Sequence, residues 1–229
     1  MNLRATWREF ADPQALAQAL ASAVADDLRD AIAARDRAAL ALSGGTTPRA
    51  FLRALAQRDL DWPRVTITLT DERWVGSDDA RSNERLLRDT LFAGAAASAR
   101  FVPLHCDVPA PEDASSIIDA DIARIGLPFD VVVLGMGLDG HTASLFPDGD
   151  RIGEALDARG TSYASPMRSP TAGEPRMTLT LPALVATRRL ALHIEGVGKR
   201  NVYESLDATL PLGAVLAAAS TPVDIYWSP

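Results

Sequence analysis

The 229-residue sequence predicts a single α/β domain with three layers, in which helices cover both faces of a mainly parallel sheet. Segments rich in apolar or β-branched residues alternate along the chain with amphipathic segments, which is the pattern of βαβ units. The composition, 47% hydrophobic and 23% charged, is that of an ordinary globular protein. The length suits one core and no shift in composition marks a linker, so we expect residues 1–229 to form one domain.

A long amphipathic helix is expected near the start of the chain. Asp12 can cap its N-terminus, and Pro13 suits its first position. Apolar residues then recur every four positions, at Leu16, Leu20, Val24, Leu28 and Ile32. That spacing predicts a helix with one apolar stripe.

Strands and helices continue to alternate up to residue 104. The apolar run 38–42 predicts a short buried strand, and a helix is expected from Thr47 and Pro48 to about Gln57. The β-branched run 65–70 predicts a second strand, which a helix over about 83–92 follows. A short strand is expected over 101–104, where Pro103 limits it to an edge or a strand end.

The second half of the chain repeats the alternation around one long loop. A helix over 113–125 leads into the apolar strand 130–134. The segment 147–175 is rich in Pro, Gly, Ser and Asp, and predicts a loop with one helical turn near 154–157. Strands are then expected over 177–181 and 189–194, a helix over 199–206, a short helix over 214–219 and a last strand over 223–227.

Charge and cysteine content narrow the class of partner. A net charge of −7 argues against nucleic acid and anionic membranes, which need a positive surface. Cys106 is the single cysteine and cannot form an intrachain disulfide. The N-terminal segment MNLRATWREF lacks the apolar core of a signal peptide, and no run is apolar enough to span a bilayer. We therefore expect a cytoplasmic protein with a small-molecule partner.

Glycines and polar residues gather directly after the predicted strands. In a parallel α/β sheet the binding crevice lies beyond the carboxyl ends of the strands. Four loops occupy that position, at residues 43–48, 71–74, 135–141 and 195–199.

The first of these loops, SGGTTP, has the composition of an anion site. Its glycines allow the backbone to approach a ligand closely, and the following helix start points free amides and a positive dipole end at it. We therefore expect phosphate contacts from Ser43, Gly44, Gly45, Thr46 and Thr47. The alternative is a tight strand-to-helix turn, and the loop lacks the Gly-Lys-Ser/Thr ending of a nucleotide P-loop.

The stretch LGMGLDGHTASLF places Gly135, Gly137 and Gly140 in the spacing G-x-G-x-x-G after a strand. A dinucleotide site would also need a long helix after the third glycine and a second strand that ends in an acid about 20 residues on, and both are missing. We interpret the glycines as shaping a loop that presents Asp139 and His141. A histidine beside an aspartate at a strand end suits general-base catalysis near neutral pH. The alternative is that His141 only caps a turn.

Cationic residues follow other strands. Arg73, in Asp71-Glu72-Arg73-Trp74, can clamp a phosphate in a bidentate manner, although a strand-end ion-pair cluster is the alternative. Lys199 begins a helix and is a second phosphate residue, with a solvated surface lysine as its alternative. Arg176, at the start of a strand, is a weaker third.

The two other histidines and the single cysteine indicate less about function. His193 lies inside a strand and is expected to be structural, whereas His105 follows an edge strand and indicates little. Cys106 has no evident base beside it. No spacing of His, Cys and carboxylates calls for a metal.

Four stretches together resemble the 6-phosphogluconolactonase family: LSGGTTPRAF, TDERWVGSDDARSNERLL, VVVLGMGLDGHTASLFP and GVGKR. They extend in order from about Leu42 to Arg200. The resemblance implies hydrolysis of 6-phospho-D-glucono-1,5-lactone to 6-phosphogluconate, the second step of the oxidative pentose phosphate pathway, without a metal or an organic cofactor. It implies a Rossmann-like fold of the glucosamine-6-phosphate deaminase type, with His141 as the catalytic residue and the 43–47 loop, Arg73 and Lys199 on the phosphate.

The mechanism that follows uses His141 to take a proton from water as the water attacks the lactone carbonyl. Asp139 would orient the imidazole, provided the loop curls. Amides of the loop that contains Gly135, Gly137 and Gly140 are expected as oxyanion donors. The sequence leaves open whether the protein is a monomer or a weak homo-oligomer.

Two rival functions remain. The related deaminases also carry an Asp-Gly-His sequence and would use Asp71 as a carboxylate base, but they have a glutamate where this chain has Phe146 and usually a tyrosine where it has Arg73. A non-catalytic sugar-phosphate sensor would keep the phosphate residues but would not need His141.

Overall fold

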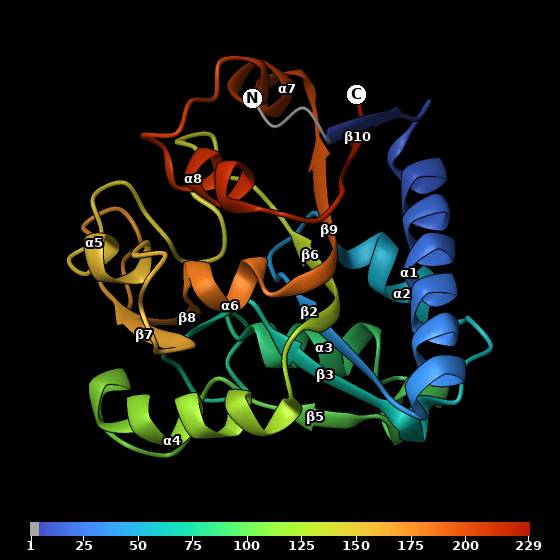
Figure 1. The fold of residues 1–229 in the computed structure, drawn as a ribbon, viewed down its shortest axis with the longest axis horizontal. Coiled ribbons are helices and arrows are strands. Elements are labelled where there is room, and N and C mark those ends of the chain that lie inside the picture. Colours follow the sequence, from blue (N-terminus) through green and yellow to red (C-terminus); the bar gives the residue numbers. More distant parts are fainter. Residues whose placement is uncertain (1–4) are drawn as a thin grey trace.

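The computed structural model describes residues 5–229 and places a parallel sheet between two layers of helices (Figure 1). Within these residues the sheet has seven strands in the order β1-β10-β9-β6-β2-β3-β5, and every neighbouring pair is parallel. The strands are β1 (Ala5–Glu9), β2 (Ala38–Leu42), β3 (Val65–Leu69), β5 (Arg100–Val102), β6 (Phe129–Leu134), β9 (Thr187–Glu195) and β10 (Val223–Ser228). The predicted fold class is confirmed.

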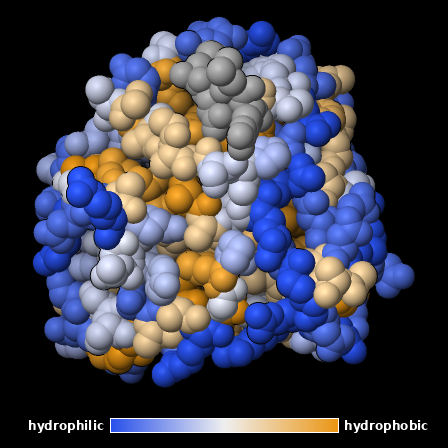
Figure 2. All heavy atoms as spheres, in the orientation of Figure 1, coloured by the Kyte–Doolittle hydropathy of each residue, from blue (hydrophilic) through white to orange (hydrophobic). Residues whose placement is uncertain are grey.

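The helices are α1 (Pro13–Arg35), α2 (Arg49–Ala56), α3 (Asn83–Thr90), α4 (Pro111–Ile125), α5 (Ile152–Ala155), α6 (Leu181–Val185), α7 (Val197–Glu204) and α8 (Pro211–Ala218). Figure 1 shows α1 and α2 on one side of the strands, and α6 and α8 on the other. In the same view, hydrophilic side chains follow the outer edge of α1 and apolar ones gather over α8 (Figure 2).

Helix α1 forms as its sequence predicts. The Asp12 side chain accepts a hydrogen bond from the Ala15 amide at 2.8 Å, which caps the helix. Its apolar stripe, from Leu16 to Leu28, is buried against the sheet, and each fully buried leucine contributes about 1.5–3 kcal/mol. The helix ends where Asp36 adopts a left-handed conformation.

The central strands β2 and β6 are buried at every position. Such burial is expected of parallel strands covered by helices on both faces, and it explains their continuous apolar sequences. Their carboxyl ends bring Ser43 and Gly135 side by side at one edge of the sheet, where Ser43 N donates to the carbonyl of Val133 at 3.0 Å. The strand-end loops are therefore fixed on a rigid base.

A small antiparallel sheet stands beside the large one, in the order β4-β8-β7. It consists of β4 (Asp71–Arg73), β8 (Arg176–Leu179) and β7 (Ala164–Met167). Strand β7 lies in the segment that we expected to be a loop with one helical turn, so that expectation is wrong there, although α5 supplies the turn. Its sequence, ASPM, carries a proline that only an edge strand tolerates and has no apolar run.

Strand β1 was also missed, because its side chains are mostly exposed and no apolar run marks it. It forms an edge of the large sheet beside β10. The first four residues of the N-terminal segment, which we expected not to belong to a signal peptide, lie outside the described residues. Within residues 5–229, no helix is both long and apolar enough to cross a membrane.

Candidate active site

The strand-end loops of both sheets enclose a cavity of about 360 Å³. The predicted site residues that line it are Ser43, Gly44, Gly45, Thr46, Thr47, Asp71, Arg73, Gly135, His141, Arg176 and Lys199. Asp139, Gly137 and Gly140 do not line it but support His141 from within the same loop. The cavity is large enough for a phosphorylated sugar.

The loop after β2 presents unpaired backbone amides. Within residues 5–229, the N–H groups of Gly44, Gly45, Thr46 and Thr47 find no acceptor. They precede α2, whose positive end adds to the attraction for an anion. The loop can therefore hold a phosphate by its backbone.

Two contacts fix the shape of this loop. The Ser43 hydroxyl lies 3.0 Å from the Thr70 hydroxyl and accepts a hydrogen bond from the Gly135 amide at 3.2 Å. A Cβ at position 44 would lie 1.9 Å from Oδ1 of Asn83, so only glycine fits there. Ser43 thus ties the first loop to the histidine loop.

The histidine loop curls so that Asp139 reaches His141. The Asp139 Oδ1 atom lies 2.6 Å from His141 Nδ1 and accepts from the His141 amide at 3.2 Å. The curl is held by Gly137 N, which donates to the His141 carbonyl at 2.9 Å. Because an ionised carboxylate only accepts, it favours the tautomer that carries its proton on Nδ1 and leaves the Nε2 lone pair free. His141 is therefore arranged to take a proton.

Glycine is required inside this loop. A Cβ on Gly137 would lie 2.2 Å from the His141 ring and 2.5 Å from Asp139 Oδ1. Gly140 has a φ of +80°, which side chains rarely adopt, and a Cβ there would meet Leu210 at 2.9 Å. The glycines of the motif make room for the Asp139–His141 pair.

The amides of the glycine motif already have acceptors. Gly135 N donates to Ser43 Oγ, Gly137 N to the His141 carbonyl and Gly140 N to the Gly137 carbonyl. The Met136 amide, from a residue that lines the cavity, has no acceptor within residues 5–229. Of this loop, Met136 is thus better placed than the three glycines to donate to an oxyanion.

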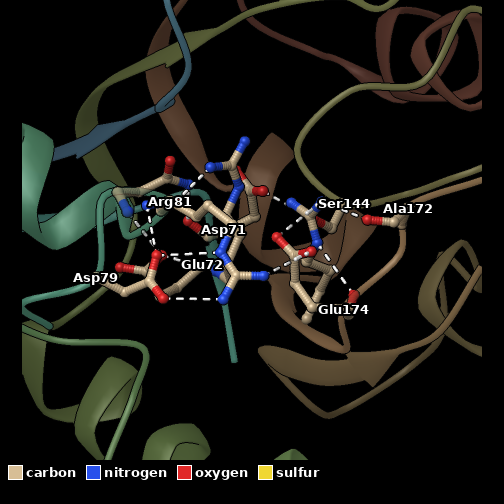
Figure 3. Close-up of polar contacts among 10 residues, drawn as sticks. Asp71, Glu72, Asp79, Arg81, Ser144, Ala172 and Glu174 are labelled. Atoms are coloured by element: carbon tan, nitrogen blue, oxygen red, sulfur yellow. Dashed lines mark hydrogen bonds and ion pairs between the residues drawn. The ribbon is translucent and has the colours of Figure 1, made fainter. Parts of the chain in front are cut away.

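The two acids after β3 have different roles. Asp71 faces the cavity, is 6% exposed, and accepts from the Ser144 hydroxyl at 2.7 Å (Figure 3). Glu72 points away and accepts from the amides of Asn83 and Glu84 at 2.7 Å each, which caps the start of α3. Burial raises the pKa of Glu72, and its backbone hydrogen bonds oppose that rise. Glu72 is structural, whereas Asp71 is available to a ligand.

Asn83 was missed by the sequence analysis. It lines the cavity at the first position of α3, and its side-chain amide donates to the Asp71 carbonyl at 2.9 Å. Its position depends on contacts between elements far apart in the chain, among them the close approach of Gly44.

Three cations face the cavity. Arg73 and Arg176 lie directly opposite each other in the β4–β8 pair, and desolvation by burial lowers the pKa of Arg176. Lys199 Nζ lies 3.3 Å from Thr47 Oγ1, so it stands beside the amide loop. Burial also lowers the pKa of Lys199, and the charge of Glu195 partly opposes this. Together they make this cavity attractive to a phosphate.

His193, which we expected to be structural, also lines the cavity. It is 2% exposed, and its Nε2 lies 3.0 Å from Glu195 Oε1. His105 lies outside the cavity and packs on Trp74, with 4.5 Å between ring centroids. Burial raises the pKa of the Cys106 thiol, which makes it a weaker nucleophile. Among the described residues, no group of three His, Cys, Asp or Glu side chains could hold a metal ion.

Residues 11–227 match the model of the family described as glucosamine-6-phosphate isomerases/6-phosphogluconolactonase. The chain belongs to this family. The 6-phosphogluconolactonase of Rhizobium meliloti (strain 1021) is 49% identical over 225 residues, which cover 96% of this chain and 97% of that protein. The 6-phosphogluconolactonase of Pseudomonas aeruginosa (strain PAO1) is 41% identical over 218 residues, 93% of this chain and 90% of that protein.

Solved structures of the family agree with this fold. A 6-phosphogluconolactonase from Shewanella baltica OS155 superposes with a TM-score of 0.96 at 38% identity, and the match covers 100% of both chains. A monomeric glucosamine-6-phosphate deaminase superposes with a TM-score of 0.79 at 19% identity over 97% of both chains, which shows a shared fold alone.

Proposed function

We propose that this protein hydrolyses 6-phospho-D-glucono-1,5-lactone to 6-phospho-D-gluconate, as a 6-phosphogluconolactonase of the oxidative pentose phosphate pathway. The observation that carries the proposal is the His141–Asp139 pair, at 2.6 Å, on a cavity that also presents free amides and three cations. The names of the related proteins support the same substrate. One end of such a substrate is a phosphate and the other is a carbonyl that water attacks.

His141 acts as the general base. Its free Nε2 takes a proton from a water molecule as the water oxygen attacks C1 of the lactone. The carbonyl π electrons move to oxygen and give a tetrahedral oxyanion, for which the Met136 amide is the proposed donor. The oxyanion electrons then re-form the C1 carbonyl as the bond from C1 to the ring oxygen breaks, and protonated His141 gives its proton to that oxygen. The resulting carboxylic acid releases its proton to water. Asp139 keeps the imidazole oriented and stabilises its charged form.

The phosphate is held by the amides of residues 44–47 together with Arg73, Arg176 and Lys199. Guanidinium groups and backbone amides are well suited to phosphate oxygens. Binding energy from the phosphate positions the distant lactone carbon against His141, which lowers the entropic part of the barrier. Addition of water, proton transfer by His141 and expulsion of the ring oxygen need neither a metal nor an organic cofactor. We place the reaction in the cytoplasm, carried out by a monomer or a weak homo-oligomer.

Deamination of glucosamine 6-phosphate is the second candidate, because Asp71 faces the cavity as a carboxylate base would. The environment of His141 disfavours it. The ring of Phe146, which stands where the deaminases have a glutamate, packs on the His141 ring with 4.7 Å between centroids. No acid is supplied from that position to support ring opening.

The test is a substrate panel with the purified wild-type protein. We expect 6-phosphogluconolactone to be consumed well above its spontaneous rate and glucono-1,5-lactone, which lacks the phosphate, to be a much poorer substrate. We expect no ammonia from glucosamine 6-phosphate. Ammonia release would make the protein a deaminase, and binding of 6-phosphogluconate without turnover of either phosphosugar would make it a sensor.

A further inference from the structure

The two arginines of the cavity oppose each other at close range. Arg73 and Arg176 are directly opposed residues of the antiparallel pair β4–β8, so their side chains leave the same face of the small sheet. Both line the cavity, and Arg176 is 8% exposed. Like charges in this position repel each other, and the charges of Asp71, Glu174 and Glu72, in that order of size, offset this repulsion at Arg176.

Arg73 also has an unmet hydrogen bond. Its Nε is buried and has no partner within residues 5–229, whereas its Nη1 donates to the carbonyl of Arg81. An unpaired buried donor of a charged group indicates that an acceptor from outside the chain completes it. The phosphate of the proposed substrate would be such an acceptor.

Glu174 forms ion pairs with Arg81 and with Arg176 (Figure 3). Its carboxylate lies 3.5 Å from Arg81 Nη1 and 3.8 Å from Arg176 Nη2. Its carbonyl accepts from Arg176 Nε at 3.3 Å. Arg81 in turn carries the carbonyl that holds Arg73. Glu174 thus contacts Arg176 directly and reaches Arg73 through Arg81, whose side chain Asp79 also holds at 2.8 Å.

Glu174 does this from outside the cavity. It is not among the residues that line the cavity, whereas Thr171 and Ala172 of the same loop are. The loop is joined to β4 by Trp74 N, which donates to the Pro175 carbonyl at 2.8 Å. The carboxylate can therefore offset the repulsion between the arginines without standing next to a bound phosphate.

We propose that Glu174 is a positioning residue that holds Arg73 and Arg176 in place for the substrate phosphate. The inference rests on the proposed function, because it assigns the two arginines to that phosphate. Glu174 does not touch the substrate. It restricts the two guanidinium groups before binding, so less conformational freedom is lost when the phosphate arrives.

The test compares Glu174→Gln, which keeps the shape and removes the charge, with Glu174→Asp, which keeps the charge. Glu112→Gln is the matched control, because Glu112 pairs with Arg168 at the other end of the same loop, where its Oε2 accepts from Arg168 Nη2 at 3.1 Å. The readouts are KM and kcat for the lactone and the Kd of 6-phosphogluconate by calorimetry.

We expect Glu174→Gln to raise KM and Kd by about two- to fivefold, the size typical of a partly exposed ion pair, with kcat unchanged. Glu174→Asp should recover part of the affinity, and Glu112→Gln should bind like the wild type. A Kd for Glu174→Gln that equals the wild-type value, or is tighter because a negative charge has gone, would overturn the positioning role. The proposed function fails separately, if the wild-type protein binds 6-phosphogluconate but hydrolyses no lactone.

Discussion

Two histidines line the same cavity, each paired with a carboxylate outside the cavity lining, and they differ in the surroundings of the ring nitrogen that the carboxylate does not contact. His141 contacts Asp139 through Nδ1 at 2.6 Å, and His193 contacts Glu195 through Nε2 at 3.0 Å. The His141 side chain is 31% exposed, whereas that of His193 is 3% exposed. The remaining nitrogen of His193, Nδ1, is buried and has no partner within residues 5–229.

Residue type and spacing alone do not decide whether a histidine is open to a ligand. In both pairs the carboxylate lies two positions from the histidine, but His141 sits on a curled loop and His193 within strand β9. The loop exposes the His141 imidazole to a ligand and to water. The strand instead holds the His193 ring in the cavity wall, where its centroid lies 6.2 Å from that of the Phe51 ring.

Replacing His141 by Ala should have the largest effect. We expect kcat for 6-phosphogluconolactone to fall by about 10²- to 10⁴-fold, the usual contribution of a general base. His193→Gln should keep most of the wild-type kcat, because His193 transfers no proton. Steady-state assays corrected for spontaneous hydrolysis would measure both, and equal losses would remove the distinction between the two pairs.

Gly137→Ala should come next, although it changes neither partner of the pair. The added Cβ would lie 2.2 Å from the His141 ring, so the ring and Asp139 must separate. We expect kcat to fall by about 100-fold, which is within the range of a displaced base. Gly153→Ala is the control, since no atom lies within 4 Å of a Cβ there. Full activity in Gly137→Ala would show that catalysis does not require the contact between His141 and Asp139.

Asp139→Asn should lower kcat by about 10- to 100-fold, because an amide can support either tautomer of His141 and no longer selects the one with a free Nε2. The loss should be smaller than that of His141→Ala, because the imidazole is still present. Glu195→Gln makes the same change in the other pair and should leave kcat near the wild-type value at neutral pH. The two variants assayed side by side give a direct comparison of the two carboxylates. A larger loss in Glu195→Gln would reverse their roles.

The smallest effect concerns Lys199 at alkaline pH. Burial lowers the pKa of Lys199, and the charge of Glu195 raises it in part. Without that charge the pKa falls further, so the ammonium loses its proton at a lower pH and phosphate binding weakens earlier as pH rises. KM measured against pH should therefore begin to rise at a lower pH in Glu195→Gln than in the wild type. A rise in KM that begins at a higher pH in Glu195→Gln than in the wild type would contradict this prediction.

The parts of the fold that the sequence predicted are those whose signal is local. Strands β2, β3 and β6 are short apolar or β-branched runs, and α1 has a cap and a regular stripe, so each could be predicted within its own segment. Strands β1 and β7 are stabilised by pairing with β10 and β8, and neither carries an apolar run. Nothing in their own residues distinguishes them from loops.

The site divides in the same way. His141, Arg73 and Lys199 follow strands or begin a helix, where the rule for parallel sheets predicts a ligand. Arg176 begins strand β8 and was only a weaker candidate. Asn83 and Glu174 reach the site through contacts with segments distant in the chain, and the feature of Met136 is a backbone amide without an acceptor among residues 5–229. These contacts form only when β4 pairs with β8 and the loops that follow β2 and β6 come together.

In the proposed mechanism, the His141 imidazole takes the proton from the attacking water. The most direct measurement is kcat of His141→Ala with and without added imidazole, with the Kd of 6-phosphogluconate as a check on binding. We predict a variant that binds like the wild type, turns over very slowly, and gains rate in proportion to the concentration of neutral imidazole. A His141→Ala protein that hydrolyses the lactone at the wild-type rate without imidazole would show that His141 is not the general base.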